Sequence, residues 1–221
     1  MEKELYIVAT PIGNLQDITA RALETLKSVD VIFCEDTRVT GKLLNHYNIS
    51  KKMISLHQHS SDEKIKSLFN QFGKIAYASD AGTPGISDPG NKIVKIAVES
   101  GFKIIPIPGA CAAISALSVS GFPTDKFLFL GFMPMKGRAR TYELIKNSEN
   151  AICFYESNHR IERTLKELQE NMPVNKSMIL ARELTKMFET IYRGRPEEIL
   201  QELGSNPKGE CVVVISPPQK S

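Results

Sequence analysis

The amino-acid sequence predicts an α/β protein of two domains, with a parallel sheet in residues 1–121 and a mixed sheet in residues 122–221. In the first half, short and continuous apolar runs alternate with helix-like segments, which is typical of a parallel sheet covered by helices on both faces. Residues 121–125 (Gly-Phe-Pro-Thr-Asp) have the composition of a linker. After them, two strand-like runs are separated by only a short connection, and this hairpin indicates a sheet of mixed direction.

The apolar runs of the first domain predict five strands, at residues 5–9, 31–34, 53–56, 74–78 and 103–107. Capping patterns place helices between them. Either Asp17 or Thr19 can cap the first helix, and Ser60 with Glu63 forms a capping box for the third. Asp88 is expected to cap the fourth helix, with proline at its first position.

The second domain is expected to contain five strands and three helices. Its apolar runs predict strands at residues 127–132, 151–155, 177–181, 188–192 and 210–215. Apolar periodicity and capping residues predict helices at residues 138–146, 158–171 and 196–203.

Composition fits a soluble enzyme of the cytoplasm. The apolar fraction of 42% suits a globular core, while no apolar run approaches the roughly 18 residues of a membrane span. The N-terminus lacks the pattern of a secretion signal. The four cysteines lie far apart and the four histidines show no convincing ligand spacing, so we expect free thiols and no metal. The net charge of +3 permits nucleic-acid binding without requiring it.

Residues 79–90 (SDAGTPGISDPG) form the most informative segment of the chain. They lie between a predicted buried strand and a predicted helix, and they combine three glycines and two prolines with small polar residues. Glycine lets a ligand approach the backbone, and proline holds a loop in one shape. In an open α/β sheet such a loop lies at the carboxyl end of a strand, where ligands bind.

Two common nucleotide sites are excluded by the loop sequences. The loop after the first strand, Thr-Pro-Ile-Gly-Asn at 10–14, is not the G-x-G-x-x-G of dinucleotide-binding folds. No segment reads G-x-x-x-x-G-K-[ST], so a triphosphate-binding loop has no support.

Charged residues follow several predicted strands, at 35–38 (EDTR), 156–160 (ESNHR) and 182–186 (RELTK). A helix cap with a local salt bridge between Asp36 and Arg38 explains the first group without any function. Recurrence over both halves favours a ligand cleft between the domains, whose walls are the strand ends.

Seven segments in order carry a resemblance to a known family: VATPIGNLQDIT, CEDTR, SDAGTPGISDPG, PIPGACAAISAL, FLGFMP, FYESNHRI and ARELTKMFETIYRG. Together they resemble the tetrapyrrole methylase superfamily, over residues 5–215. More narrowly, the chain is similar to the branch that 2′-O-methylates a cytidine of small-subunit (16S) ribosomal RNA. The resemblance implies an N-terminal Rossmann-like domain, a C-terminal mixed-sheet domain, S-adenosylmethionine in the interdomain cleft, and a homodimer.

The resemblance also assigns residues to the cofactor. In the first domain these are Pro11, Ile12, Thr83, Gly85, Ile86 and Cys111. The set is completed by Ala112 and by four residues of the second domain: Tyr155, Arg182, Leu184 and Thr185. Thr83 stands where many members have an aspartate, and an uncharged threonine can still hydrogen-bond the methionine end.

Methyl transfer to a ribose hydroxyl needs alignment of two atoms and removal of one proton. Candidates for the base are Asp36, Glu156 and His159, with Arg38 and Lys186 as electrostatic partners. For contacts to RNA phosphates, which position RNA without reading it, we expect Arg38, Arg138, Arg140 and Arg160.

Two other functions remain open at this point. One is methylation of a carbon in a tetrapyrrole ring, although the basic clusters favour RNA. The other is a ribosome-assembly protein without activity, which the intact glycine-proline loops argue against. Members of the RNA-methylating branch often continue into a C-terminal helical module, whereas this sequence ends at Ser221. We therefore expect the preferred substrate to be the assembled 30S subunit, whose surface supplies extra contacts.

Overall fold

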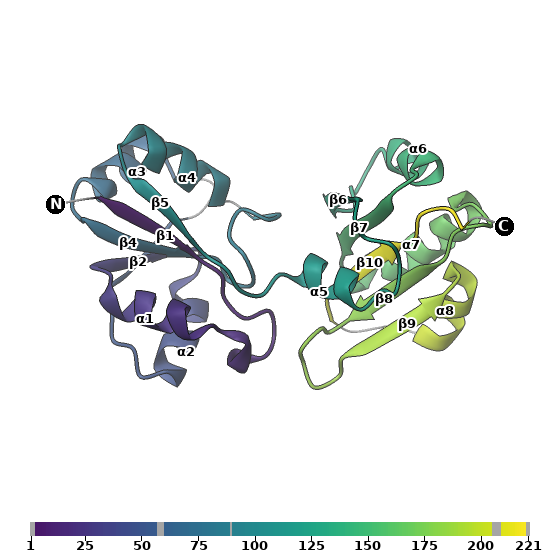
Figure 1. Cartoon of the computed structure of the whole chain (residues 1–221), viewed down its shortest axis with the longest axis horizontal. Helices are drawn as coiled ribbons and strands as arrows, with labels where there is room; N and C mark the ends of the chain where they lie inside the picture. Colours follow the sequence, from purple (N-terminus) through teal and green to yellow (C-terminus); the bar gives the residue numbers. More distant parts are fainter. Residues whose placement is uncertain (1–2, 57–59, 89, 205–208, 220–221) are drawn as a thin grey trace. The chain divides into compact units, whose positions relative to one another are not determined.

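A computed structural model describes residues 3–56, 60–88, 90–204 and 209–219. The chain divides into two compact units, Met1–Cys111 and Ala112–Ser221, which are described separately below as unit 1 and unit 2 (Figure 1). The two α/β units agree with the predicted fold class.

Unit 1 is built on a five-stranded sheet in which every strand is parallel to its neighbours. The strands lie in the order β3-β2-β4-β1-β5. Their bounds are β1 Glu4–Val8, β2 Val31–Cys34, β3 Met53–Ser55, β4 Lys74–Ala78 and β5 Lys103–Ile107. Because parallel strands end together, the five loops that follow them emerge at one edge of the sheet.

Helices cover both faces of the unit 1 sheet (Figure 1). Apolar side chains of α1 (Ala20–Ser28) and α2 (Thr37–His46) share one core with Val8, Ile32 and Ala76. The opposite core contains α3 (Asp62–Phe69) and α4 (Gly90–Glu99), packed on alternate residues of the same strands. A short 3-10 helix, η1 (Leu15–Asp17), precedes α1.

Strand β4 occupies the middle of this sheet, between β2 and β1. The helices that follow β1 and β2 cover one face, whereas α4, which follows β4, covers the other. After β1 and β2 the chain therefore turns toward one face of the sheet, and after β4, which lies between them, it turns toward the other face. In α/β sheets, ligands bind in the crevice that such a change of direction creates.

Helix caps in unit 1 confirm one prediction and correct another. Thr19 caps α1, since its side chain accepts a hydrogen bond from the backbone N–H of Ala22 at 3.1 Å. Helix α3 is capped by Ser61, which accepts from the N–H of Lys64, and not by Ser60. The capping-box spacing favoured Ser60, but packing of Ile65 in the core sets where the helix begins.

Unit 2 contains a five-stranded mixed sheet in the order β6-β7-β10-β8-β9. Its strands are β6 Phe127–Phe132, β7 Ala151–Glu156, β8 Met178–Arg182, β9 Thr190–Gly194 and β10 Cys211–Ile215. Only β6 and β7 pair in parallel, while the other three pairings are antiparallel. The predicted hairpin is β8 and β9.

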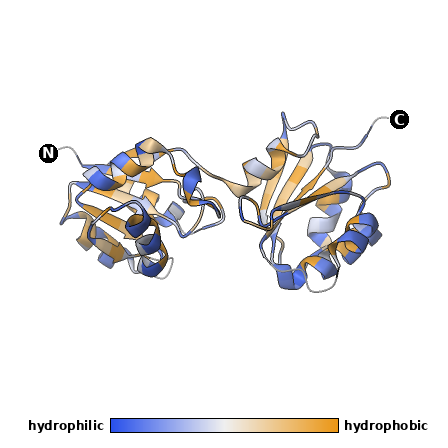
Figure 2. Cartoon of the chain, turned by 90° about the horizontal axis from the view of Figure 1, so that it is seen from below, coloured by the Kyte–Doolittle hydropathy of each residue, from blue (hydrophilic) through white to orange (hydrophobic). Residues whose placement is uncertain are grey.

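Four helices pack on this second sheet. Helices α6 (Ala139–Asn147), α7 (Asn158–Asn171) and α8 (Pro196–Leu203) share one core with its strands. Helix α5 (Ala112–Ser118) packs on β7 and β10, and the thiol of Cys153 lies 3.9 Å from the carbonyl oxygen of Ala113. Figure 2 shows apolar strands inside each unit and polar helix surfaces outside.

The two units meet in the chain at residues 111 and 112, whereas the expected linker is at 121–125. The segment between them is anchored in unit 2, because the guanidinium of Arg193 on β9 donates to the carbonyl oxygens of Val119 and Ser120. Among the described residues, no helix is both long and apolar enough to cross a lipid bilayer.

Candidate functional site

Three loops are joined at the carboxyl edge of the unit 1 sheet: residues 10–14 (the first loop), 79–90 (the glycine-proline loop) and 108–111 (the third loop). Thr10 and Gly82 exchange backbone hydrogen bonds of 2.9 and 3.1 Å. The hydroxyl of Thr83 donates to the carbonyl oxygen of Ala110 at 3.0 Å. The loops therefore form one connected surface.

Close backbone approach explains why glycine is needed here. Gly82 has φ +81°, and a Cβ at this position would lie 3.3 Å from a methyl carbon of Ile12. A Cβ on Gly109 would lie 2.9 Å from the Cβ of Ala9, nearer than side chains tolerate. The absence of a side chain thus lets the glycine-proline loop lie close to the first loop, and the third loop close to Ala9, the residue after β1.

Asp88 holds the glycine-proline loop in its shape. Its Oδ1 accepts hydrogen bonds from the N–H groups of Gly85 and Gly90, and the Gly90 bond is 2.9 Å long. This agrees with the predicted cap of α4, while Pro89 lies outside the described residues. The turn is tightened by the N–H of Ile86, which donates to the carbonyl oxygen of Thr83 at 3.3 Å.

Three carboxylates gather around this edge. Glu35 follows β2, while Asp80 and Asp88 begin and end the glycine-proline loop. Burial, followed by the charges of Asp88 and Asp80, raises the pKa of Glu35. Burial, followed by the charges of Glu35 and Asp88, also raises the pKa of the buried Tyr77. The edge therefore has a negative potential, which favours a cationic ligand over a phosphate.

Asp36 and Arg38 form the local pair that a helix cap predicts. Oδ1 of Asp36 accepts from the N–H of Arg38 at 2.8 Å, and both carboxylate oxygens contact the guanidinium. Hydrogen bonds from Arg38 lower the pKa of Asp36 to about 2. A carboxylate so easily ionised is a weak base, which argues against Asp36 as the proton acceptor.

Unit 2 brings its predicted site segments to one edge of its own sheet. The start of β10, Cys211, pairs with Glu156 at the end of β7 on one side and with Arg182 at the end of β8 on the other. Phe132, at the end of β6, pairs with Tyr155. The charged strand ends that the sequence singled out are therefore neighbours within this unit.

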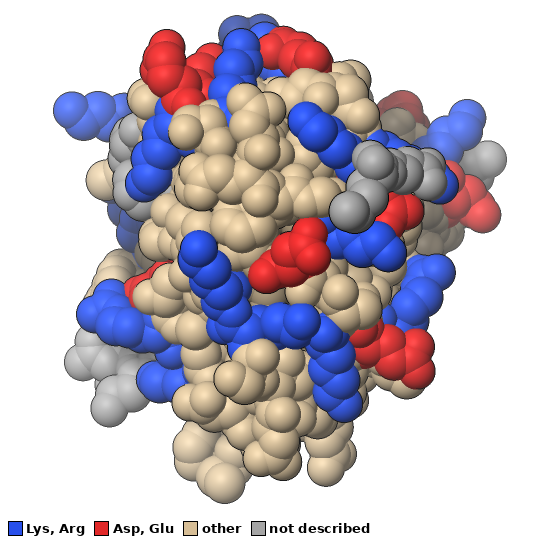
Figure 3. All heavy atoms as spheres, turned by 90° about the vertical axis from the view of Figure 1, so that its left-hand side faces the viewer, with Lys and Arg blue, Asp and Glu red and all other residues tan. Residues whose placement is uncertain are grey.

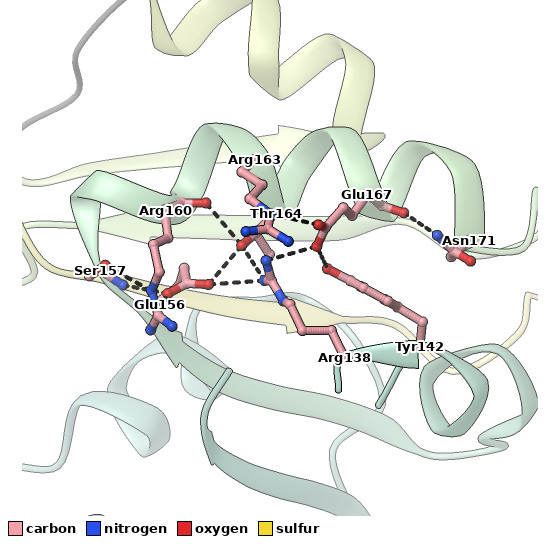
Figure 4. Close-up of polar contacts among 9 residues, drawn as sticks. All are labelled: Arg138, Tyr142, Glu156, Ser157, Arg160, Arg163, Thr164, Glu167 and Asn171. Atoms are coloured by element: carbon pink, nitrogen blue, oxygen red, sulfur yellow. Dashed lines mark hydrogen bonds and ion pairs between the residues drawn. The ribbon is translucent and has the colours of Figure 1, made fainter. Parts of the chain in front are cut away.

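Glu156 is the centre of a buried ionic network and not an available base (Figure 4). Its side chain is fully buried. Oε1 accepts from the N–H of Ser157 at 2.8 Å and from Arg160 at 2.7 Å. Oε2 lies 3.1 Å from Arg138 and 2.7 Å from the hydroxyl of Thr164. Both oxygens are occupied inside the protein, which argues against Glu156 as the group that takes a substrate proton.

Arg138 was expected to contact RNA phosphate, and its burial argues against that role. Its side chain is only 6% exposed and also pairs with Glu167 at 2.7 Å. Glu167 in turn pairs with Arg163 and accepts from the hydroxyl of Tyr142 at 2.6 Å. Arg138 therefore joins α6 to the end of β7 and to α7, as Figure 4 shows.

The other predicted RNA contacts differ in availability. Arg140 is exposed, as is Lys136 beside it. Arg160 is 26% exposed, and its guanidinium is directed to Glu156 and to the hydroxyl of Ser157. Arg38 is 87% exposed but engages Asp36. Arg140 is thus the cation best suited to reach a phosphate.

The loop between β8 and β9 contains three of the predicted residues. Leu184 is partly buried, and Thr185, with φ +65°, donates its N–H to Glu189 at 2.6 Å. Lys186 pairs with Glu183 at 2.9 Å and Glu210 at 3.1 Å. Burial alone would lower the pKa of Lys186, but these hydrogen bonds raise it overall. Lys186 therefore remains a cation, which fits an electrostatic role.

Tyr155 and the start of α5 are brought together in unit 2. The phenol oxygen of Tyr155 accepts a hydrogen bond from the N–H of Ala113 at 3.2 Å. This contact places Tyr155 at the start of α5, whose first residue is Ala112. The assignment of these residues and of Arg182 to the cofactor stays a prediction.

His159 remains a candidate base. It lies in the first turn of α7 and is exposed, and within the described residues no hydrogen bond or ion pair engages its ring. Among the described residues, no group of three His, Cys, Asp or Glu side chains could hold a metal ion. All four cysteines are free thiols.

The sequence analysis missed Glu35 and Asp80 as site residues. The signal for them was position, because Glu35 directly follows β2 and Asp80 lies two residues after β4. The distribution of charge on the surface does not locate the site, because Lys and Arg lie among Asp and Glu on the face shown in Figure 3.

Known proteins share this sequence and fold. A model of the tetrapyrrole (corrin/porphyrin) methylases matches residues 4–200. A ribosomal RNA small subunit methyltransferase I from Haemophilus influenzae is 48% identical, over 98% of this chain and 80% of its own length. The protein of that name from Vibrio cholerae is 49% identical, over 96% of this chain and 76% of its own length.

Solved structures show the same architecture at low sequence identity. A uroporphyrin-III-C-methyltransferase from Thermus thermophilus has a TM-score of 0.68 and 18% identity, with 96% of this chain and 93% of that chain covered. The methyltransferase CobJ has a TM-score of 0.70 and 15% identity, with 97% and 94% covered. The family match and the shared fold lead to one conclusion: the chain belongs to the tetrapyrrole methylase family.

Proposed function

We propose that this protein transfers a methyl group from S-adenosylmethionine to the 2′-hydroxyl of a cytidine in small-subunit (16S) ribosomal RNA. The observation that carries the proposal is the identity of nearly half the residues to curated ribosomal RNA small subunit methyltransferases I, over almost the whole chain. The tetrapyrrole methyltransferases share the fold at below 20% identity, so they do not favour ring methylation here.

The carboxyl edge of unit 1 suits this cofactor. S-adenosylmethionine carries a positive sulfonium and a positive ammonium group, and it supplies a methyl group that is already activated. Glu35, Asp80 and Asp88 provide the negative potential that such a ligand needs, whereas a phosphate would be repelled. Among the residues assigned to the cofactor, Pro11, Ile12, Thr83, Gly85 and Ile86 all belong to the joined loops.

The side chains do not have to activate the methyl group, because the sulfonium of S-adenosylmethionine activates it before the cofactor binds. The protein has to align the ribose hydroxyl with the methyl group and exclude alternatives. Proton removal falls to His159 or to solvent, since Asp36 and Glu156 are held in internal contacts. Lys186, kept positive by Glu183 and Glu210, is proposed to stabilise the developing oxyanion.

The finer points of the proposal concern the partners. We propose that the assembled 30S subunit is the substrate, that the enzyme acts as a homodimer, and that it works in the cytoplasm. Purified protein should methylate assembled subunits faster than naked 16S RNA. Equal rates on both substrates would remove the 30S requirement, and light scattering at working concentration would test the dimer.

The decisive experiment is mass mapping of small-subunit RNA from cells that lack this protein. One ribose methyl should be missing, and the intact gene should restore it. An unchanged methylation pattern would overturn the proposed substrate. Parallel analysis of the tetrapyrrole pool would reveal ring methylation, the alternative chemistry of the family.

A further inference from the structure

A small pocket lies in unit 1 at the carboxyl edge of the sheet, beside the joined loops. Its volume is about 200 Å³. Pockets for drug-sized ligands usually measure roughly 300–1,000 Å³, so this one is suited to a single ring and not to a whole cofactor. It lies where β1, β2 and β4 end, at the point where the chain switches faces.

The apolar lining of the pocket comes from the segment that follows β1 and from α2. Pro11 and Leu15 line it from the first loop and η1, and Val39 and Leu43 line it from α2. Apolar side chains from two separate elements are what a flat ring needs on its faces. Enzymes that act on a nucleotide within structured RNA take it out of the stack and hold the base between such side chains.

The polar lining consists of the hydroxyl side chains of Thr10, Thr40 and Ser79 and of two charged groups, Asp80 and Lys42. Oδ1 of Asp80 accepts from the N–H of Asp36 at 3.1 Å, and within the described residues its other oxygen has no hydrogen bond or ion pair. Lys42 is exposed, with no hydrogen bond or ion pair in the described part of the chain. The pocket thus offers a free acceptor and a free donor.

This combination distinguishes the two pyrimidines. Cytosine presents an amino group, N4, next to the acceptors N3 and O2, and acidic side chains typically accept from N4. Uracil presents the oxygen O4 in place of the amino group. A carboxylate facing O4 would bring two acceptors together, which costs free energy.

We propose that this pocket holds the base of the target nucleotide, and that Asp80, assisted by Lys42, selects cytosine over uracil. The inference rests on the proposed function, because it assumes a ribose of RNA as the methyl acceptor. It adds a second role for Asp80, selection of the base, to the contribution that this carboxylate makes to the negative potential of the edge.

The test compares methyl transfer to 30S subunits that carry either cytidine or uridine at the target position. Asp80→Asn keeps the oxygen that accepts from Asp36, but replaces the free acceptor by an amide that can donate to uracil O4. We expect this variant to lose about tenfold in kcat/KM on cytidine subunits, and the cytidine-to-uridine ratio to fall by more than that. Rates are compared at saturating S-adenosylmethionine, because Asp80 also contributes to the negative potential of the cofactor edge and its loss should weaken cofactor binding.

A second variant tests whether the pocket must be empty for the base to bind. Val39→Phe should fill it and reduce transfer to both substrates, with cofactor affinity retained. Val98→Phe, at an exposed valine of α4 that does not line the pocket, is the control and should behave as the unaltered protein. Circular dichroism checks that each variant is folded.

The outcomes separate the two proposals. Transfer by the unaltered protein, together with an undiminished cytidine preference in Asp80→Asn, would overturn the base pocket and leave the proposed function standing. Full activity of Val39→Phe would do the same. Absence of transfer to cytidine subunits by the unaltered protein would overturn the proposed function and this inference with it.

Discussion

Acidic residues lie at the carboxyl edge of the unit 1 sheet and at the corresponding edge of unit 2, but among the described residues their charges are compensated only in unit 2. In unit 1, Glu35, Asp80 and Asp88 lie together, and within the described residues no ion pair neutralises them. In unit 2, Glu156 and Glu167 are shared among three arginines in a mostly buried network.

This difference distinguishes carboxylates that stabilise the fold from carboxylates that are available to a ligand. A buried carboxylate with every oxygen occupied has its charge compensated inside the protein, so it positions the chain and nothing more. Carboxylates that repel one another at a loop surface oppose folding, and such arrangements are typical of sites where a ligand provides the compensation. Unit 1 therefore contains the ligand-ready edge, and Glu156 supports the turn that presents Ser157 and His159.

The strongest way to break this comparison is to remove the centre of the network. Glu156→Ala leaves Arg138 and Arg160 without their shared carboxylate, and breaking a buried pair typically costs about 3–5 kcal/mol. Urea unfolding should show this loss in the transition of unit 2. Glu170→Ala, which removes an exposed acid on α7, should change stability by less than about 0.5 kcal/mol. Equal effects of the two changes would mean that the network is not structural.

A change in the glycine-proline loop should affect binding before stability. Gly85 has φ +87°, and a Cβ there would lie 3.0 Å from Oδ1 of Asn91. Gly85→Val should therefore distort the loop and abolish detectable binding of S-adenosylmethionine in calorimetry. Gly101→Val is the matched control, because its φ of +76° imposes similar backbone strain away from the loop. Retained affinity in Gly85→Val would contradict the assignment of this loop to the cofactor.

The basic residues of unit 2 offer a sharper test of exposure. Arg140→Ala should reduce the slope of log affinity for RNA against log salt by about 1, because one phosphate contact is lost. Arg138→Met should leave that slope unchanged and lower the stability, since the buried guanidinium contacts glutamates. A reduced slope in Arg138→Met would show that the network opens to bind RNA.

The smallest expected effect concerns Glu35. Burial, followed by the charges of Asp88 and Asp80, raises its pKa in the folded protein. The folded state then binds this proton more tightly than the unfolded chain, so the ionised group opposes folding above its folded pKa. Glu35→Gln should raise Tm near neutral pH, and the gain should disappear as the pH falls through the folded-state pKa toward the usual glutamate value. A gain of the same size at all pH values would exclude a charge effect.

A second variant sharpens that measurement. In an Asp80→Asn background, one of the repelling charges is already absent, so Glu35→Gln should raise Tm by less. The difference between the two gains measures the coupling between the two carboxylates.

Local sequence predicted the sheets well because the strands are continuous apolar runs. Residues 31–34, 74–78 and 103–107 were predicted with the bounds that the structure shows, since each is framed by charged or turn-forming residues. Ser60 and Ser61 could not be separated, because both are good caps and only packing farther along α3 distinguishes them.

The site was harder to predict than the fold. Arg138 lies in a basic cluster in the sequence, yet its partners Glu156 and Glu167 belong to later elements that fold onto it. Asp80 was part of the loop that drew attention first, but its free carboxylate oxygen is visible only beside α2. Pairing between distant residues determines which charges are available, and no local pattern encodes it.

The middle position of β4 has a consequence for how the protein is made. Strands β1 and β2 are synthesised first but are not neighbours, because β4 must insert between them. During synthesis, β1 and β2 therefore cannot pair with β4 until residues 74–78 have emerged from the ribosome. The other edge of β1 stays unpaired until β5 has been made. Contacts of this range slow folding and leave apolar strands exposed during translation. The order of strands that creates the binding crevice thus also makes the newly synthesised chain dependent on protection from aggregation.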